Sequence, residues 1–295
     1  LLGPYSSGLT GSIMPLLEEN SFPLLASGAA SDNLWQQGYR YLFGIFSPAS
    51  RYAVGFLEMI AMKDMTRLAI VSADDSFSTV MAAGTKKWAE RFGLEVIMKL
   101  GFKKGTRDLT AIAQKLAPAK VDALVVCGHF NEALDMRLAL KKTNYQPKAY
   151  FASIGPAMQK YRDMLGEDAE LSFSSSQWEP SLTYRPEDKK VFLLPFREKY
   201  GVEPSYHAAD AFAAGQILAA AVEKAGTLDR KKIRDTLSSM NYVSIIGRYG
   251  VDKTGLQTRH FPINIQWQQG TKKIVWPEEL STAQPQFSSP VPAAK

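Results

Sequence analysis

The sequence predicts an α/β protein in which parallel sheets are flanked by helices. Short β-branched and apolar segments alternate with amphipathic segments of helical period along most of the chain. Strands separated by single helices form βαβ units, which build parallel sheets with helices on both faces. The length of 295 residues is sufficient for about two domains.

The individual elements are read from hydrophobic period and turn residues. Leu1-Leu2 is expected to be the end of a buried parallel strand. Further strands are expected over 23–26, 41–46, 68–72, 94–100, 123–127, 149–153 and 171–175. The expected helices span 6–19, 77–92, 106–117, 131–142, 187–200, 206–225 and 229–240, with Ser6 or Ser7 capping the first and Thr106 capping the third. No helix is expected over 246–276, where two strands meet at Gln269-Gly270, and the Pro-, Ala- and Ser-rich residues 283–295 predict a disordered tail.

Composition narrows the function classes. Hydrophobic residues make up 45% and charged residues 22% of the chain, and no run of about 18 apolar residues suits a transmembrane helix. The net charge of +6 is spread over many segments without the basic stripe that nucleic-acid binding needs. Cys127 is the only cysteine, which excludes an internal disulfide and a cysteine-based metal cage. We therefore expect no nucleic-acid partner, no metal and no cofactor.

Enzymatic motifs are also missing from the pattern. The segment "PYSSG" lacks the first glycine of a GxSxG nucleophile motif, and no P-loop or GxGxxG follows an expected strand. Asp74-Asp75 resembles a carboxylate pair, but without a matching acid cluster helix capping is the favoured role. We expect no catalytic residues.

The first residues indicate a place for an anion. Gly3-Pro4 turns the chain after the first strand, and Ser6 or Ser7 then begins a helix. A helix N-terminus at the carboxyl end of a parallel strand presents unpaired N–H groups and the positive end of the dipole. The small residues 27–31 follow the next strand and offer further backbone N–H groups to a carboxylate.

Several later strand ends carry similar loops. Phe77, His129-Phe130 and Ile154 each follow an expected strand and precede a helix. Aromatic side chains and backbone donors at the carboxyl ends of strands are typical of a cleft that encloses a small molecule.

These segments together resemble a known family. "GPYSSG", "PLLASGAASDNLWQQGYRYLF", "LAIVSADDSFS", "VDALVVCGHF", "YHAADAFAAGQILAAAVEKAG" and "GRYGVDKTGLQ" with "IQWQQGTKKIVWPEEL" are similar in order and spacing to the Leu/Ile/Val-binding protein family. Its members are type I periplasmic solute-binding proteins of ABC transporters. The resemblance extends over nearly the whole chain, from Gly3 to Leu280.

The resemblance implies a two-lobed type I periplasmic-binding-protein fold with three interlobe crossings. The N-terminal lobe would comprise 1–47 and 177–258, and the C-terminal lobe 48–176 and 259–282. The N-terminal lobe would be incomplete, lacking the family's first βαβα units and the signal segment that precedes them.

The resemblance also implies site residues. A ligand carboxylate would bind at Ser7, with Ser6 beside it, and at a second loop that maps onto Gly28, Ala29 and Ala30. Ser31 would replace the hydroxyl that relatives carry at Ala30.

Aromatic positions of the family fall on Phe77 and on His129, with Phe130 adjacent, although His129 also suits a packing role. The acid that pairs a ligand ammonium falls on Ile154, which cannot accept a charge-assisted hydrogen bond. Trp178 and Glu179 are the alternative contributors, and Trp178 is equally suited to packing at a crossing.

The implied function is that of a solute-binding component of an ABC uptake transporter. It would bind an amino acid or related small carboxylate in the interlobe cleft and deliver it to an inner-membrane ABC permease. Its place would be the periplasm, free or lipid-anchored at the cell surface. The alternative is a cytoplasmic or receptor-type sensing domain of the same fold with an amide, urea-like or aromatic carboxylate ligand.

Overall fold

The chain forms two compact units in the computed structural model, which describes residues 1–182 and 184–288. Unit 1 comprises Leu1–Ala49 and Gln177–Pro262, and unit 2 comprises Ser50–Ser176 and the chain from Ile263 onward. The chain therefore crosses between the units three times, after residues 49, 176 and 262. The boundaries expected after residues 47 and 258 lie slightly before the first and third of these crossings.

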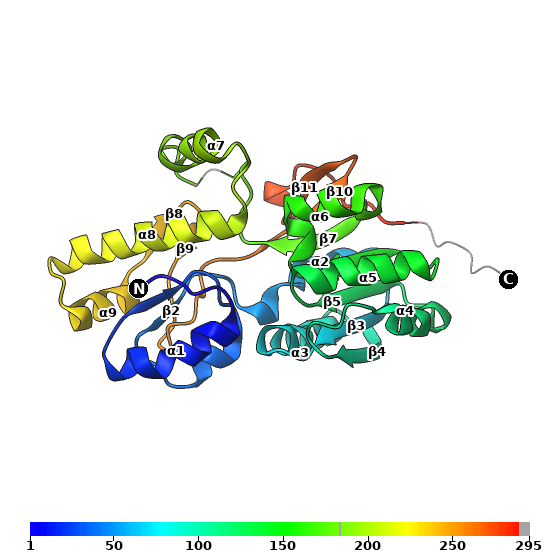
Figure 1. Ribbon diagram of the computed structural model, residues 1–295, viewed down its shortest axis with the longest axis horizontal. Coiled ribbons are helices and arrows are strands. Elements are labelled where there is room, and N and C mark those ends of the chain that lie inside the picture. The colour runs from blue at the N-terminus through cyan, green and yellow to red at the C-terminus, as the bar shows by residue number, and fades with distance from the viewer. Residues whose placement is uncertain (183, 289–295) are drawn as a thin grey trace. The chain divides into compact units, whose positions relative to one another are not determined.

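Unit 2 is built on a mixed sheet of seven strands in the order β11-β10-β7-β6-β5-β3-β4 among the described residues (Figure 1). The strands are β3 (Arg67–Ala73), β4 (Glu95–Phe102), β5 (Ala123–Cys127), β6 (Ala149–Ala152), β7 (Ser172–Ser176), β10 (Ile263–Gln268) and β11 (Thr271–Trp276). Strands β4, β3, β5, β6 and β7 are parallel, whereas β10 is antiparallel to β7 and β11 is antiparallel to β10. The expected parallel sheet is thus extended by an antiparallel hairpin.

Helices alternate with the strands of unit 2. They are α2 (Val54–Ala61), α3 (Ser76–Arg91), α4 (Thr110–Leu116), α5 (Phe130–Lys142) and α6 (Gln159–Leu165). All five residues of β5 are buried, as expected for a central strand that is covered on both faces. The chain order of strand and helix places the N-termini of α3 and α5 directly after the neighbouring strands β3 and β5.

Unit 1 contains a short parallel pair and a group of helices. Its elements are α1 (Ser7–Glu19), β1 (Leu24–Ala26), β2 (Leu42–Gly44), α7 (Leu194–Tyr200), α8 (Tyr206–Ala225), α9 (Arg230–Ser239), β8 (Tyr242–Ser244) and β9 (Gly247–Tyr249). Strands β1 and β2 are parallel, β8 and β9 form an antiparallel hairpin, and α8 packs against α9 and β8 (Figure 1). Leu2 bridges to Leu25 in parallel, but Leu1 and Leu2 remain about half exposed, so the prediction that they are buried is wrong.

Two helices differ from their predicted extents. Helix α4 begins at Thr110, because the carboxylate of Asp108, and not the hydroxyl of Thr106, accepts a hydrogen bond from the first helical N–H. Thr106 instead donates to the carbonyl of Lys103 within the preceding turn. The segment predicted as one helix over 187–200 starts with a π-helical turn at Lys189–Leu193 before α7. Pro195 lacks an N–H and crowds the preceding turn, which disfavours regular α-helical bonding there.

The segment after β11 is more ordered than its composition predicts. The Gln286 N–H donates to the Gln266 side chain at 2.9 Å, and the Ser288 hydroxyl donates to the Pro147 carbonyl at 2.7 Å. The Phe287 ring stacks on Phe173 at 5.5 Å. The predicted disorder is therefore wrong for 283–288, because this segment is held by polar side chains of β10 and by a ring of β7. The remaining residues of the predicted tail, 289–295, lie outside the described residues.

Candidate functional site

In unit 1, the N-terminus of α1 lies beside the loop that follows β1. Ser6 is the N-cap: its Oγ accepts a hydrogen bond from the Leu9 N–H at 3.3 Å, and its own N–H donates to the Gly28 carbonyl at 3.0 Å. Leu2 and Leu25, which precede these two loops, form a parallel bridge, so both loops leave the strands at the same edge. We call Ser6, Ser7 and residues 27–31 the serine group. The hydrogen bonds between these two loops place them side by side, and the binding of a carboxylate by them stays a prediction.

Ser7 is the centre of the serine group. Its Oγ accepts hydrogen bonds from the N–H groups of Ala30 at 3.2 Å and Ser31 at 3.0 Å, and the residue is only 3% exposed. A hydroxyl has two acceptor positions and one donor. Because both acceptor positions are used, the remaining capacity of the Ser7 hydroxyl is to donate a hydrogen bond, which suits an anionic oxygen.

The small residues of the loop are also required by packing within the chain. A Cβ at Gly28 would lie 2.9 Å from the Tyr5 Cα, closer than side-chain atoms approach backbone. Ala29 is fully buried in the hydrophobic core of unit 1, and the Ala30 carbonyl accepts from the Ala49 N–H at 2.7 Å. Packing within the chain therefore requires small residues in this loop, whether or not a ligand binds there.

Aromatic residues that the sequence analysis did not include lie next to the serine group. The Tyr5 ring, 48% exposed, meets the His207 ring edge-on at 5.2 Å. His207 stacks on Tyr206 at 4.0 Å, and Phe46 lies 6.0 Å from Tyr206. Proximity of Tyr5 to Ser6 in sequence was a usable signal, whereas the approach of Phe46 to the start of α8 depends on tertiary structure.

In unit 2, two predicted aromatic positions come together. The Phe77 ring lies 5.2 Å from the His129 ring, and Tyr52 meets Phe77 edge-on at 5.4 Å. Phe77 and His129 follow the adjacent strands β3 and β5, which explains their approach. Tyr52 was not predicted, because it lies in a turn without a motif. We call Tyr52, Asp75, Phe77 and His129 the ring group.

Asp75 links these two strand ends. It is the N-cap of α3, as its predicted capping role required, and its Oδ1 also lies 3.2 Å from His129 Nε2. Burial alone would raise the pKa of the Asp75 carboxyl, but hydrogen bonds from His129 and Ser78 and the charge of His129 outweigh burial and hold the pKa well below its usual range. Asp75 is therefore an ionised carboxylate at neutral pH.

Two other predicted residues of unit 2 have packing environments. Phe130 packs partly buried against the hydrophobic core, and the Lys160 ammonium lies 5.6 Å from its ring centroid. Ile154 is 5% exposed and precedes a short 3₁₀ turn, where its neighbour Ser153 hydrogen-bonds Gly128. Among the described residues, the Phe77 ring contacts the rings of Tyr52 and His129 but not that of Phe130.

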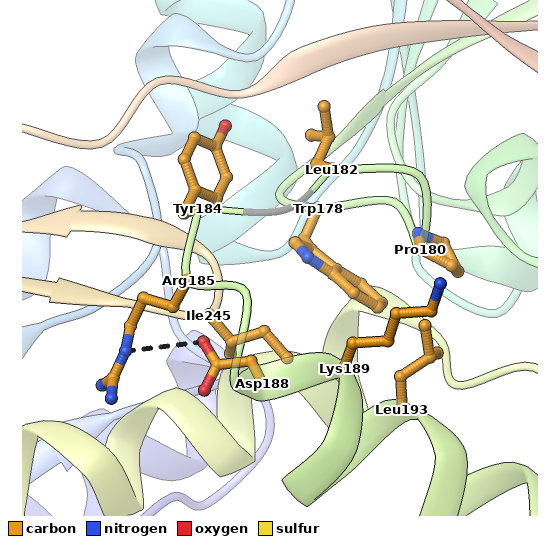
Figure 2. Close-up of a pocket in the computed structure, with 9 residues that line it drawn as sticks. All are labelled: Trp178, Pro180, Leu182, Tyr184, Arg185, Asp188, Lys189, Leu193 and Ile245. Carbon is orange, nitrogen blue, oxygen red and sulfur yellow. Dashed lines mark ion pairs between the residues drawn. The ribbon is translucent and has the colours of Figure 1, made fainter.

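Trp178 lines a separate pocket of unit 1. Trp178 is 2% exposed and meets Phe192 edge-on at 6.3 Å. Figure 2 shows its indole facing Lys189 and Leu193. The residues of the serine group are not among those that line this pocket. These contacts favour the packing role of Trp178. Glu179 beside it is also buried, and its carbonyl accepts from the Leu182 N–H at 2.9 Å.

The charged residues of the same pocket form an internal network (Figure 2). Asp188 accepts from Gln216 Nε2 at 2.7 Å, and its second oxygen lies 3.8 Å from Arg185 Nε. Burial raises the pKa of Asp188, opposed by the Gln216 hydrogen bond and the Arg185 charge. The Gln216 carbonyl oxygen in turn accepts from the Ile245 N–H at 2.9 Å. This network ties the segment after Gln177 to α8 and to the turn after β8.

Metal-binding clusters and membrane-spanning helices do not occur in the part of the chain that the structure describes. Within it, no three His, Cys, Asp or Glu side chains gather closely enough to hold a metal ion. Over the same residues, no helix combines the length and apolarity needed to cross a bilayer.

Comparisons with known proteins agree with this architecture. The periplasmic binding protein family model matches residues 1–272. A Leu/Ile/Val-binding protein homologue of Brucella abortus is 22% identical over 97% of this chain and 75% of its own length. The Streptococcus pneumoniae LivJ structure with isoleucine superposes with a TM-score of 0.80 at 21% identity, covering 92% of this chain and 76% of its own. A solute-binding protein of R. palustris with benzoate gives 0.82 at 15% identity, covering 99% and 79%.

The chain belongs to the periplasmic binding protein family, whose members bind solutes. Its fold is the two-lobed type I periplasmic-binding-protein fold, with a mixed sheet flanked by helices.

Proposed function

We propose that this protein is the solute-binding component of an ABC uptake transporter for a small organic carboxylate. It binds the solute in the periplasm and delivers it to a membrane permease. Family membership supports this role, and structural neighbours were solved with isoleucine and with benzoate, both of which carry a carboxylate. The proposal makes the serine group the place where the carboxylate binds.

The observation that carries the proposal is the hydrogen-bond state of Ser7. Two backbone N–H groups occupy the acceptor positions of its Oγ, so the remaining capacity of the hydroxyl is to donate. The first N–H groups of α1 and the positive end of its dipole lie at the same residue, and both favour an anion. A donor hydroxyl and a helix N-terminus together suit a carboxylate better than an ammonium.

The solute body is inferred from the aromatic residues. Tyr5 and His207 lie near the serine group, and the ring group presents Phe77 and His129. Offset and edge-on contacts with such rings stabilise a planar ring more than a short aliphatic chain. We propose that the solute is an aromatic carboxylate and that the ring group contributes to its binding.

The residues at and near the predicted ammonium position argue against an ammonium on the solute. Ile154 offers no acceptor, and the Asp75 carboxylate already accepts from α3 and from His129. A buried ammonium without a partner costs several kcal/mol. Glu179 is the one acid among the predicted site residues. The variant Glu179→Gln therefore distinguishes an amino acid from a carboxylate that carries no ammonium.

The test is calorimetry of phenylpropanoate against phenylalanine, which differ chiefly in the amino group. We expect phenylpropanoate and benzoate to bind and phenylalanine to bind more weakly, with Glu179→Gln leaving the order unchanged. Tighter binding of phenylalanine, with a gap that shrinks in Glu179→Gln, would replace the aromatic carboxylate by an amino acid. Failure of every carboxylate, including leucine and 4-methylpentanoate, would overturn the proposed function.

A further inference from the structure

Two helix N-termini of unit 2 meet at one carboxylate. Strands β3 and β5 are neighbours in parallel register, with Ser72 opposite Cys127. The residues that follow these strands therefore leave the same edge of the sheet. Asp75, the N-cap of α3, and His129, the N-cap of α5, are joined there at 3.2 Å.

The Asp75 carboxylate is surrounded by donors. Its Oδ1 accepts from the N–H groups of Phe77 at 3.1 Å and Ser78 at 3.3 Å and faces His129 Nε2, while its Oδ2 accepts from Ser78 Oγ at 2.7 Å. An ionised carboxylate has no proton to donate, so His129 Nε2 must carry the hydrogen of this contact. This contact favours the tautomer with the hydrogen on Nε2, as does the capping box of α5, in which the His129 side chain accepts from the Glu132 backbone N–H.

The same carboxylate fixes two rings. It holds the first turn of α3, from which Phe77 projects, and it holds the imidazole of His129. The two rings lie 5.2 Å apart at 44°, and Tyr52 packs edge-on against Phe77. The side chains of Asp75 and His129 are 16% and 17% exposed, so the link is largely screened from water.

We propose that Asp75 is a positioning residue of the solute site, which sets solute affinity by fixing the Phe77 and His129 rings without contacting the solute. This inference rests on the proposed function, in which the ring group contributes to binding. It differs from a capping role, because a cap requires only the contacts to the first turn of α3, whereas positioning requires the link to His129 as well.

The substitution that separates the two roles is Asp75→Ser. Serine is about as good an N-cap as aspartate, but its shorter side chain does not reach the imidazole. Asp75→Asn is the conservative variant, because its amide oxygen accepts the same N–H groups and its amide nitrogen can donate to Ser78 Oγ. Asp229, the N-cap of α9 in unit 1, offers a matched control, because among the described residues its carboxylate hydrogen-bonds its own helix alone.

Calorimetry with phenylpropanoate measures the effect on affinity. We expect Asp75→Ser to weaken binding by about tenfold or more, as for loss of a charge-assisted hydrogen bond, while Asp75→Asn restores most of the affinity. Asp229→Ser should bind like wild type. In a His129→Ala background the Asp75→Ser change should have a much smaller effect, because residues that act through one another are not additive.

Nitrogen-15 NMR of the imidazole provides a readout that needs no solute. Wild-type His129 should show a protonated Nε2, and Asp75→Ser should move this signal because the Nε2–H loses its carboxylate acceptor, with Asp229→Ser unchanged. If wild type binds phenylpropanoate and Asp75→Ser binds it equally well, or if its His129 signal does not move, the inference is overturned while the proposed function stands. Wild-type protein that binds no carboxylate overturns the proposed function, and the affinity role of Asp75 with it.

Discussion

Replacing Ser7 by alanine should destabilise unit 1 and weaken solute binding together. The change removes the Oγ that accepts from the N–H groups of Ala30 and Ser31, both of which are buried. Each buried donor left without a partner costs about 1–3 kcal/mol, so we expect the free energy of unfolding to fall by about 2–4 kcal/mol after partial relaxation. Urea denaturation measures this loss. Calorimetry should show carboxylate affinity reduced by about tenfold or more, since the donor hydroxyl is also lost.

A matched control lies on the same helix. Ser12 donates from its Oγ to the Gly8 carbonyl at 3.0 Å on the exposed side of α1. Ser12→Ala should change the free energy of unfolding by less than about 0.5 kcal/mol and leave affinity unchanged. A Ser7→Ala protein as stable as the Ser12→Ala protein would refute the hydrogen bonds on which the serine group depends. A loss of stability with full affinity would show that Ser7 is structural alone.

Three further predictions concern buried residues. Burial lowers the pKa of His260 from 6.5 to about 4. Between pH 6.5 and about 4 the unfolded chain therefore binds more protons than the folded chain, and the free energy of unfolding should fall by about 3 kcal/mol as pH falls through this range. In urea denaturation, His260→Gln should remove this contribution to the pH dependence of the free energy of unfolding. Burial raises the pKa of Asp210 well above its usual 3.8, and neither oxygen hydrogen-bonds a described residue. Stability is thus lost as pH rises above 3.8, and Asp210→Ala should stabilise the protein at neutral pH by about 1–3 kcal/mol in the same assay, whereas a loss would point to an unseen partner. Ala29 is fully buried, so Ala29→Leu should cost about 1–3 kcal/mol by overpacking, and an unchanged thermal midpoint would contradict its place in the core.

Most of the fold could be predicted from sequence because most elements carry their own local signal, whereas α2, β8 and β9 were not predicted. Gly93 and Gly226 follow α3 and α8 with positive φ, the conformation in which glycine commonly ends a helix. One error was a choice between two local caps: Asp108, and not Thr106, accepts from the Thr110 N–H at the start of α4. The other arose where tertiary contacts outweigh local pattern, because the segment around Phe287 is ordered by side chains of distant strands.

The candidate site was predictable in part for the same reason. The strand-to-helix junctions identified Ser7, Phe77 and His129, because parallel strands bring their carboxyl ends to one edge. The link from Asp75 to His129 was not predictable, since it depends on the distance between two helix N-termini. The environment of Trp178 likewise depends on the π-helical turn, which the periodic pattern does not reveal.

The central claim is that the solute is recognised through its carboxylate. The most direct measurement is calorimetric titration of the protein with phenylpropanoate and with phenylpropanamide, which keeps the ring and chain but replaces the anion by a neutral amide. We predict that the acid binds and that the amide binds at least about tenfold more weakly, because a charge-assisted hydrogen bond is lost. Equal binding of the two, or tighter binding of the amide, would contradict the claim.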